Sequence, residues 1–575
     1  MYLLAHRYLI LNFLVLITLS IIGCNINAKD KNKSSYDIVV YGGTSAGVTA
    51  AIQSSRMGKS ILLIEPTQRL GGLTSGGLGA TDIGNKDAIG GISREFYQNV
   101  HKYYMNSSNW KGQKKSEYIG GEQGRTDERE DAMWTFEPSA ALKVYKDMID
   151  LEKIDLIYGE RLDEEGGVIK ENRTITQIVM ESGATYEGKV FIDATYEGDL
   201  MASAGVSYAV GRESSNTYSE SLNGVQLYPE GLPDDIDPVK VDYFSRVSRN
   251  RHQFPNGVDP YIEKGNPESG LLWGISSDTL QSNGTGDDKA QAYNFRMTLT
   301  NNSENRIPIT RPTGYDSTRY ELLVRLFEAQ PDLRAINDYF IWTRMPNNKT
   351  DVNNRGGFST DMIGMNHDYP EANYEKRQEI IEDHEAYTKG LLYFYKTDPR
   401  VPSELQEFIF EWGYPKDEFI KNDHFTPQLY IREARRMVGE YVMTQNNVVG
   451  SKVAQDSIGM AAYGMDSHHI QRVVEDGMVQ NEGDIQVHNF PPYPISYRSL
   501  TPKAEEAKNL LVPVALSATH IAFGSIRMEP VFMVLGQSAA TAASIAIDNQ
   551  VDVQEVNYQK LKRQLQKDKQ RLNDG

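Results

Sequence analysis

Cysteine is nearly absent from this 575-residue chain, which has one, at position 24. A single thiol excludes an intramolecular disulfide framework, a CxxC redox pair and any cysteine-ligated zinc or iron–sulfur site. Positive charge is also scarce, since 60 Lys and Arg residues stand against 78 Asp and Glu residues and leave a net charge of −18. Such a protein repels phosphate, so we do not expect it to bind nucleic acid. The ten histidines show no HExxH pattern, and we predict no metal site.

The position of the cysteine indicates a lipid anchor. The apolar run 9–22 follows a short head that contains Arg7, and it is too short for a comfortable membrane span but suits a secretory signal. It ends in Ile-Ile-Gly-Cys, which resembles a bacterial lipobox with Cys24 as the lipidated residue. An ordinary signal peptide with a coincidental cysteine is the alternative. We predict a lipoprotein signal peptide over residues 1–23, a polar tether over 24–35 and a protein anchored in the bacterial cell envelope, on its periplasmic or outer-membrane face.

A dinucleotide-binding βαβ unit begins the folded part. Residues 37–41 read as a buried strand, a glycine turn and a small apolar helix follow, and residues 60–64 read as a second strand that leads to Glu65. In such a unit the turn and the helix N-terminus bind a pyrophosphate, and the acid after the second strand binds ribose hydroxyls. The middle glycine of GxGxxG is replaced by a threonine, a small side chain that the turn can tolerate. The turn residues that we expect to bind the cofactor are Gly42, Gly43, Thr44, Ser45, Ala46 and Gly47.

A second glycine-rich segment indicates which dinucleotide is bound. Residues 69–79 contain five glycines shortly after Glu65, which lets the backbone approach a flat ring and a pyrophosphate. Here the sequence resembles the FAD-dependent oxidoreductases of the glutathione-reductase-like superfamily, in which some secreted bacterial members are labelled xanthan lyase. A flexible surface loop is the alternative, because glycine clusters are common in loops. The resemblance implies FAD contacts at Arg69, Gly71, Gly72, Gly76, Gly77 and Leu78.

Two later segments fit the same family. Residues 188–195 read as a strand with a small-residue end, and they resemble the family's returning strand, which passes the cofactor again. Asp199 is expected either to bind a ribityl or ribose hydroxyl or to cap the helix that follows. Pro530 begins a helix rich in small residues, and the resemblance implies that its N-terminus stabilises negative charge on the flavin. These segments add Ala194, Thr195, Asp199, Pro530 and Gly536 to the expected FAD-binding residues.

The resemblance implies an α/β fold in which a Rossmann-like FAD-binding domain, with three layers and a parallel sheet, carries an inserted α+β substrate or cap domain. We place the FAD-binding domain at 36–217 and 424–555, the cap at 218–423 and a C-terminal helix at 556–575. Within the second part, residues 429–445 read as an amphipathic helix whose arginines form solvated ion pairs. Polar runs in the insertion predict either turns or a polar surface over the flavin that binds a hydroxylated substrate.

Histidine and arginine are the catalytic candidates, because the folded chain has no thiol. His468 and His520 lie in segments where the chain returns to the flavin, and Arg527 follows His520 by seven residues. Our hypothesis is hydride transfer between a substrate carbon and FAD, with proton transfer by His520 or His468. Arg527 would orient a substrate oxygen or stabilise the reduced flavin. A packed structural histidine is the alternative at each position.

The sequence therefore predicts an FAD-dependent oxidoreductase that acts on a polar small molecule, with saccharides as one candidate class. A second strand-led GxGxxG is missing, so we do not expect a separate NAD(P)H domain. The glycine segment contains no histidine for covalent flavin attachment. A redox-neutral lyase or isomerase on a saccharide and a non-catalytic glycan-binding surface lipoprotein are the alternatives. The oligomeric state does not follow from the sequence.

Overall fold

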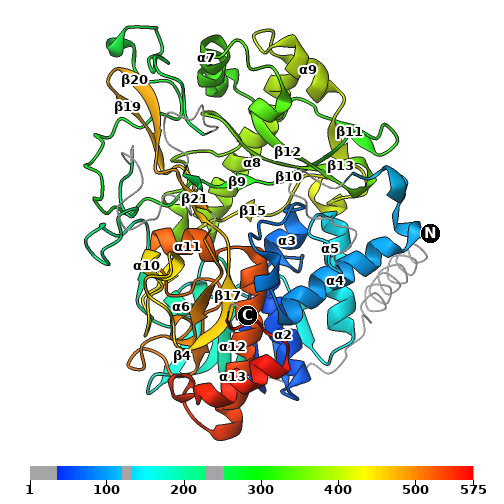
Figure 1. The fold of residues 1–575 in the computed structure, drawn as a ribbon, viewed down its shortest axis with the longest axis vertical. Helices are drawn as coiled ribbons and strands as arrows, with labels where there is room; N and C mark the ends of the chain where they lie inside the picture. The colour runs from blue at the N-terminus through cyan, green and yellow to red at the C-terminus, as the bar shows by residue number, and fades with distance from the viewer. Residues whose placement is uncertain (1–34, 120–130, 228–241, 244–251, 489, 574–575) are drawn as a thin grey trace, which may run out of the picture.

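The computed structural model describes residues 35–119, 131–227, 242–243, 252–488 and 490–573 (Figure 1). The predicted signal peptide and the anchor at Cys24 lie outside these residues, so both stay predictions. Figure 1 shows a lower body that contains elements from both ends of the chain, in blue, cyan and orange to red, and an upper body that is mostly green.

A seven-stranded sheet forms the centre of the lower body. Its strand order is β3-β2-β1-β6-β5-β4, and β23 also pairs with β6. Strands β1, β2, β3, β6 and β23 run parallel, whereas β4 and β5 form an antiparallel extension. A parallel sheet whose first strand leads into a glycine turn and a helix is the arrangement that dinucleotide-binding domains share. The strands are β1 (Ser35–Tyr41), β2 (Ile61–Glu65), β3 (Asp155–Tyr158), β4 (Val168–Glu171), β5 (Thr174–Val179), β6 (Thr185–Asp193) and β23 (Leu510–Leu511).

Helices cover one face of this sheet. Ile38 and Val40 of β1 belong to a core that they share with residues of seven helices, whereas Val39 and Tyr41 pack on the opposite face with residues of β5 and α6. This alternation follows from the two-residue period of a strand. The predicted three-layer, Rossmann-like domain is confirmed. Its helices are α2 (Ser45–Arg56), α3 (Gly72–Gly76), α4 (Gly91–Met105), α5 (Pro138–Asp150), α6 (Asp199–Ser203), α10 (Gln445–Val448), α11 (His520–Ile526), α12 (Glu529–Asn549) and α13 (Tyr558–Lys567).

Helix α12 packs directly on α2 within the helical layer (Figure 1). Gly536 permits this contact, because a Cβ atom there would overlap the carbonyl oxygen of Ala46. Across the same contact the Thr49 hydroxyl donates to the carbonyl oxygen of Met533 at 2.9 Å. Among the described residues, α12 alone is long and apolar enough to cross a membrane, and 94% of its apolar stretch is buried inside the protein. Helix α12 is thus a core helix of the lower body.

The upper body is an α+β cap built on a five-stranded antiparallel sheet of order β11-β14-β10-β13-β12. A separate apolar core fills it and includes Tyr293, Phe340 and Leu391. An inserted α+β domain was predicted, and the structure has one. Its elements are β9 (Asn294–Phe295), β10 (Met297–Thr300), β11 (Arg306–Pro308), β12 (Phe340–Met345), β13 (Lys349–Asn354), β14 (Gly413–Pro415), α7 (Glu321–Ala329), α8 (Tyr374–Thr397) and α9 (Ser403–Phe410).

The two bodies do not separate at the expected boundary between residues 423 and 424. Strand β15 (Leu429–Tyr430) pairs with β9 of the cap, and Val479 belongs to the cap core. The hairpin that contains Val479 consists of β19 (Gln471–Glu475) and β20 (Met478–Glu482) and lies beside the cap in Figure 1. The chain thus passes through the cap a second time. The other strands are β7 (Tyr208–Ala209), β8 (Asp242–Tyr243), β16 (Arg436–Met437), β17 (Ser457–Ala461), β18 (Met465–Ser467), β21 (Ile485–His488) and β22 (Tyr493–Ser496).

The prediction of an amphipathic helix over residues 429–445 is wrong. The segment contains the short strands β15 and β16, which pair with β9 and β7, and only its last residue begins a helix. Its arginines are buried instead of solvated: Arg432 is 1% exposed and Arg436 is 0% exposed. Each has a buried carboxylate partner, Asp361 for Arg432 and Glu433 for Arg436. Tertiary pairing therefore overrides the helical pattern of polar residues.

We predict that Gly536→Ala destabilises the protein. The added methyl group meets the α2 backbone, which cannot move without disturbing the glycine turn, so we expect a loss of about 1–3 kcal/mol in the free energy of unfolding. Gly166→Ala is the matched control, because a Cβ atom there has no neighbour within 4 Å. Urea unfolding monitored by circular dichroism measures both. Equal midpoints for the two variants would contradict the assigned role of the α2–α12 contact.

Candidate functional site

A cavity of about 440 Å³ lies beside the ends of β1 and β2, between the two bodies. This volume falls within the range of small-molecule and cofactor sites. Residues of the cap, among them Tyr374, Arg377 and Gln378, form part of its wall. Seven of the residues expected to bind FAD line the cavity, although they come from three separate parts of the sequence: Gly42, Thr44, Glu65, Arg69, Gly72, Thr195 and Asp199.

The turn after β1 has the geometry that a pyrophosphate requires. Gly42 has a φ of +98°, and a Cβ atom on it would lie 2.7 Å from the Ala194 backbone. The Thr44 hydroxyl donates to the Ala194 carbonyl oxygen at 2.7 Å and also caps α2 by accepting from Gly47 N at 3.4 Å. The threonine that replaces the middle glycine thus joins the turn to the returning strand. Ser45 and Ala46 form the buried first turn of α2, whose N–H groups can bind an anion.

Glu65 lies on the cavity wall and holds the turn in place. Its carboxylate accepts from Gly43 N at 2.8 Å and from Thr67 N at 2.6 Å. Burial raises the pKa of Glu65 to about 7, against the effect of these hydrogen bonds. A carboxyl group so withdrawn from water gains from an additional donor, which a ribose hydroxyl would supply. Binding of the ribose by Glu65 stays a prediction, and the structure adds a second role, in which Glu65 holds the backbone of the glycine turn.

The glycine segment after β2 is shaped by the protein around it. Arg69 donates to the Ser75 carbonyl oxygen at 2.8 Å and 2.6 Å, which curls the segment around α3. A Cβ atom would overlap Tyr145 at Gly71, Tyr196 at Gly72, Gln428 at Gly76, Thr426 at Gly77 and Met345 at Gly79. Three of these five partners belong to the cap side: Met345 ends β12 of the cap sheet, and Thr426 and Gln428 come just before β15, which pairs with β9. Several glycines are thus needed for close packing of the cap on this segment, in addition to any approach to a cofactor.

Asp351 of β13 fixes the end of that glycine segment. Its Oδ2 accepts from Gly79 N at 2.9 Å and from Ala80 N at 2.8 Å. Arg296 binds the same carboxylate through two nitrogens, at 2.9 Å and 2.8 Å, and its NH1 reaches Asp82 at 3.2 Å. Asp351 and Arg296 are buried, so this pair is strong where it forms and costly where it is broken. The cap therefore sets the position of the segment expected to face the flavin.

The returning strand ends beside the cavity. Thr195 lines it, and Ala194 lies behind the glycine turn. The expectation that Asp199 caps α6 is wrong, because the N-cap is Gly198 and Asp199 is the first helical residue. The Asp199 carboxylate binds Arg377 at 2.8 Å and 2.9 Å and Arg435 at 2.8 Å. The two guanidinium groups hold the pKa of Asp199 below its ordinary value, so this residue joins the cap to the nucleotide-binding body.

Sequence reasoning missed Glu529, which lies at the start of α12 beside Pro530. Its carboxylate accepts from the Thr74 hydroxyl at 2.6 Å and from the Tyr196 hydroxyl at 2.7 Å. Burial raises its pKa. Through these contacts the start of α12 meets the glycine segment. The role of Pro530 at the flavin stays a prediction. An acid in the first turn of a helix is common, so no local pattern indicates that this one is buried.

A second polar centre lies between the bodies, around His468. Its Nδ1 lies 2.8 Å from Asp361 Oδ2, and its Nε2 lies 3.6 Å from Asp466 Oδ1. Burial and the Arg432 guanidinium lower the pKa of His468 well below its ordinary value, so the ring is neutral at pH 7. With Asp361 accepting from Nδ1–H, Nε2 carries the lone pair. This is the arrangement of an oriented general base.

His520 is held differently. Its Nδ1 lies 2.7 Å from Glu433 Oε2 and its Nε2 lies 2.9 Å from Ser467 Oγ, and the residue is 2% exposed. Both ring nitrogens thus have protein partners. His520 therefore positions Glu433 and Ser467. Of the two predicted histidines, His468 is the better candidate for proton transfer.

Arg527 connects the His468 centre to the glycine segment. Its NH2 lies 3.5 Å from Asp466 Oδ2, and its NH1 donates to the Tyr430 hydroxyl at 2.5 Å. Tyr430 in turn packs with Leu73 and Leu78 of the glycine segment. Tyr430 is a second residue that the sequence analysis did not single out, because its segment was predicted to be a helix and Tyr430 lies in strand β15.

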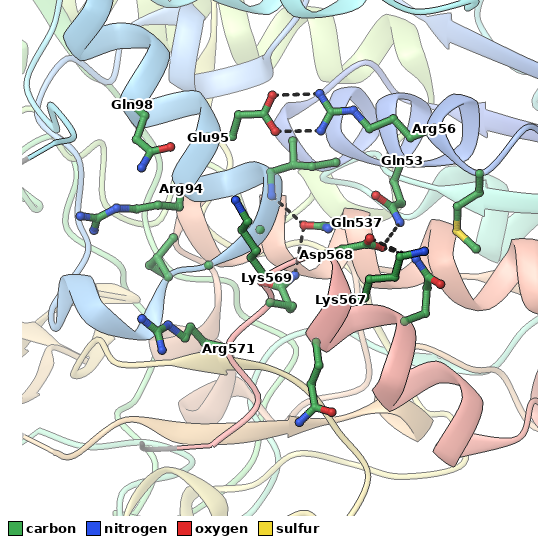
Figure 2. Close-up of a pocket in the computed structure, with 18 of the residues that line it drawn as sticks. Gln53, Arg56, Arg94, Glu95, Gln98, Gln537, Lys567, Asp568, Lys569 and Arg571 are labelled. Atoms are coloured by element: carbon green, nitrogen blue, oxygen red, sulfur yellow. Dashed lines mark hydrogen bonds and ion pairs between the residues drawn. The ribbon is translucent and has the colours of Figure 1, made fainter.

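A larger cavity of about 940 Å³ lies elsewhere, where the C-terminal segment crosses the ends of α2 and α4 (Figure 2). Some of its polar groups bind one another: Arg56 binds Glu95 with two nitrogens, at 2.7 Å and 2.8 Å, and Asp568 accepts from Gln53 at 2.7 Å. None of the residues expected to bind cofactor or substrate lines it. Within the described parts of the chain, no group of three or more His, Cys, Asp or Glu residues could hold a metal ion. We therefore place the functional site at the smaller cavity and the His468 centre.

The fold and the smaller cavity define a Rossmann-type dinucleotide-binding protein. The chain matches the model of the family described as FAD dependent oxidoreductase over residues 37–565. It therefore belongs to this family. The glycine cradle, the start of α2 and the cavity beside Glu65 fit FAD.

Parts of the chain are also similar to solved structures. Thioredoxin reductase from T. acidophilum is 17% identical, with 28% of this chain and 35% of that chain covered and a TM-score of 0.17. A 3-ketosteroid-delta4-(5alpha)-dehydrogenase from Rhodococcus jostii is 16% identical, with 31% and 50% covered and a TM-score of 0.19. Bacillithiol disulfide reductase from Staphylococcus aureus is 17% identical, with 28% and 38% covered and a TM-score of 0.18. The chain thus spans half or less of the length of each.

Asp351→Ala should destabilise the protein and loosen FAD binding. It leaves Arg296 buried with Asp82 as its remaining ion-pair partner and frees the N–H groups of Gly79 and Ala80, so we expect a loss of about 3–5 kcal/mol in the free energy of unfolding. Asp383→Ala removes a more exposed cap carboxylate that pairs with Arg319, and it should cost about 0–1 kcal/mol. Urea unfolding gives the energies, and flavin absorbance after gel filtration gives the FAD content. Matching losses in the two variants would refute the role of Asp351.

Proposed function

We propose that this protein transfers a hydride between FAD and a polar, hydroxylated small molecule of carbohydrate-derived type. The observation that carries the proposal is the His468–Asp361 pair, which lies beside Asp466 and is joined through Arg527 and Tyr430 to the glycine segment. A neutral, oriented imidazole near the cofactor segment is what the oxidation of an alcohol requires.

Each partner of this centre has a distinct task in the proposed reaction. Bound FAD supplies the acceptor for a hydride, which takes both electrons of the substrate's carbon–hydrogen bond. Nε2 of His468 takes the hydroxyl proton, and the carbonyl bond forms from the electrons of the oxygen–hydrogen bond. Asp361 stabilises the imidazolium that results. Arg527 binds the substrate oxygen or, as first predicted, stabilises the negative charge of the reduced flavin.

The substrate class rests on the polar groups around His468. Asp466 and Asp361 are buried carboxylates, and Gln291 donates to Glu433 and accepts from the His468 backbone N–H. Carboxylates and amides bind hydroxyl groups, which both donate and accept. The charges of this centre are mixed, so it does not favour a strongly anionic substrate. A neutral polyol or sugar suits it better.

The substrate class can be tested by anaerobic flavin reduction. The purified protein with FAD, mixed without oxygen with a panel of sugars, polyols, sugar acids and steroids, should lose its absorbance near 450 nm with a sugar or polyol. Steroids serve as the apolar comparison. Bleaching by steroids alone would refute the hydroxylated substrate class, and turnover of a sugar that leaves the flavin oxidised at the end would favour a redox-neutral reaction.

His468→Gln should slow flavin reduction by about 100-fold or more, because the general base is lost. In the wild type the rate should stay constant as pH falls to 6.5 and decline only below it, because the pKa of His468 is lowered and the ring stays neutral above that pH. Stopped-flow reduction at several pH values measures both effects. His101→Gln, on α4, is the control. A His468→Gln variant with full FAD content and wild-type reduction would remove His468 from the mechanism.

A further inference from the structure

The nucleotide cavity has one wall that belongs to the cap. Helix α8 lines it with Tyr374, Arg377, Gln378 and Ile381, opposite residues that follow β1 and β2. The cap was expected to bind substrate, yet this wall faces the glycine turn of the nucleotide-binding body. None of the residues of the His468 centre lines the same cavity.

Buried ion pairs hold α8 over the cavity. Arg377 is 5% exposed and binds Asp199 through two nitrogens, and Arg435 binds the same carboxylate. The Tyr369 hydroxyl, just before α8, donates to Glu197 at 3.0 Å. A bidentate arginine–carboxylate pair at this depth fixes orientation as well as distance. The wall is therefore part of the assembled fold and not an incidental neighbour.

The first turn of α8 also contacts the segment that follows β3. The Tyr374 hydroxyl donates to the Leu162 carbonyl oxygen at 3.1 Å, and the Tyr374 N–H donates to Glu164 at 2.7 Å. The Arg161 guanidinium lies 4.6 Å from the centre of the Tyr374 ring. Tyr374 thus lies at the carboxyl ends of β2 and β3, where a doubly wound sheet binds the first mononucleotide of a dinucleotide.

We propose that α8 of the cap is part of the FAD site and binds the adenosine diphosphate half of the cofactor. Tyr374 and Ile381 supply an aromatic and an apolar surface for the adenine or ribose, and Gln378 supplies an amide for a hydroxyl or ring nitrogen. The Asp199–Arg377 pair keeps this wall closed. The inference rests on FAD binding and is independent of the proposed substrate.

Two variants test the proposal, with FMN as the comparison ligand because it lacks the adenosine half. The purified protein, stripped of flavin, is titrated with FAD, ADP and FMN. Flavin fluorescence follows the binding of FAD and FMN, and calorimetry follows the binding of ADP. Tyr374→Ala should raise the Kd for FAD and ADP about tenfold, as the loss of one aromatic surface does elsewhere, and leave the Kd for FMN unchanged. Tyr393→Ala is the matched control, since Tyr393 is on the same helix but packs against Tyr315 away from the cavity.

Gln378→Glu covers the case in which Tyr374→Ala fails to fold. Gln378 is exposed, so the change leaves the core intact, and the new carboxylate repels the diphosphate and should weaken FAD binding several-fold at low salt. A Kd for FAD within twofold of wild type in both variants would overturn the proposal, as would equal weakening of FAD and FMN. A wild-type chain that binds no FAD would overturn it together with the cofactor assignment, whereas failure of the sugar screen would leave it intact.

Discussion

The packing of α12 against α2 is the contact on which the rest of the structure depends. It joins residues as far apart as Thr49 and Met533, 484 positions apart in the chain, and it requires a glycine at 536 because the helices approach within backbone contact. With α12 in this place, Glu529 reaches Thr74 and Tyr196. Close packing of two buried helices thus brings the C-terminal part of the chain to the glycine segment and completes a site that neither end forms alone.

Buried charges then fix the cap on this frame. Asp351 binds the backbone of the glycine segment, and Asp199 binds Arg377 of α8. Taking such groups out of water is costly unless every partner is present, so each pair stabilises one docking geometry over all others. The cap therefore shapes both halves of the cofactor site, the glycine segment through Asp351 and the nucleotide cavity through α8. The His468 centre lies between the same two bodies and depends on the same docking.

Much of the fold and part of the site could be predicted because their signals are local. A buried strand, a glycine turn, a small apolar helix and a second strand follow one another within 30 residues, and each requires its residue types for reasons of backbone geometry alone. The segment 429–445 failed for the opposite reason. Its arginines read as a solvated helical face, whereas distant carboxylates such as Asp361 allow them to be buried. His520 and Glu529 likewise have partners that lie far away in sequence.

The single cysteine, the glycine turn and the second glycine segment determined by themselves that this chain forms no intramolecular disulfide and carries a dinucleotide-binding unit. They did so because a missing thiol and a needed φ above zero are properties of single residues. Only the tertiary structure decided that His468 has an oriented, neutral ring, that both nitrogens of His520 are occupied, and that α8 of the cap lines the nucleotide cavity. Burial and long-range pairing set protonation and access, and neither is encoded in the spacing of neighbouring residues.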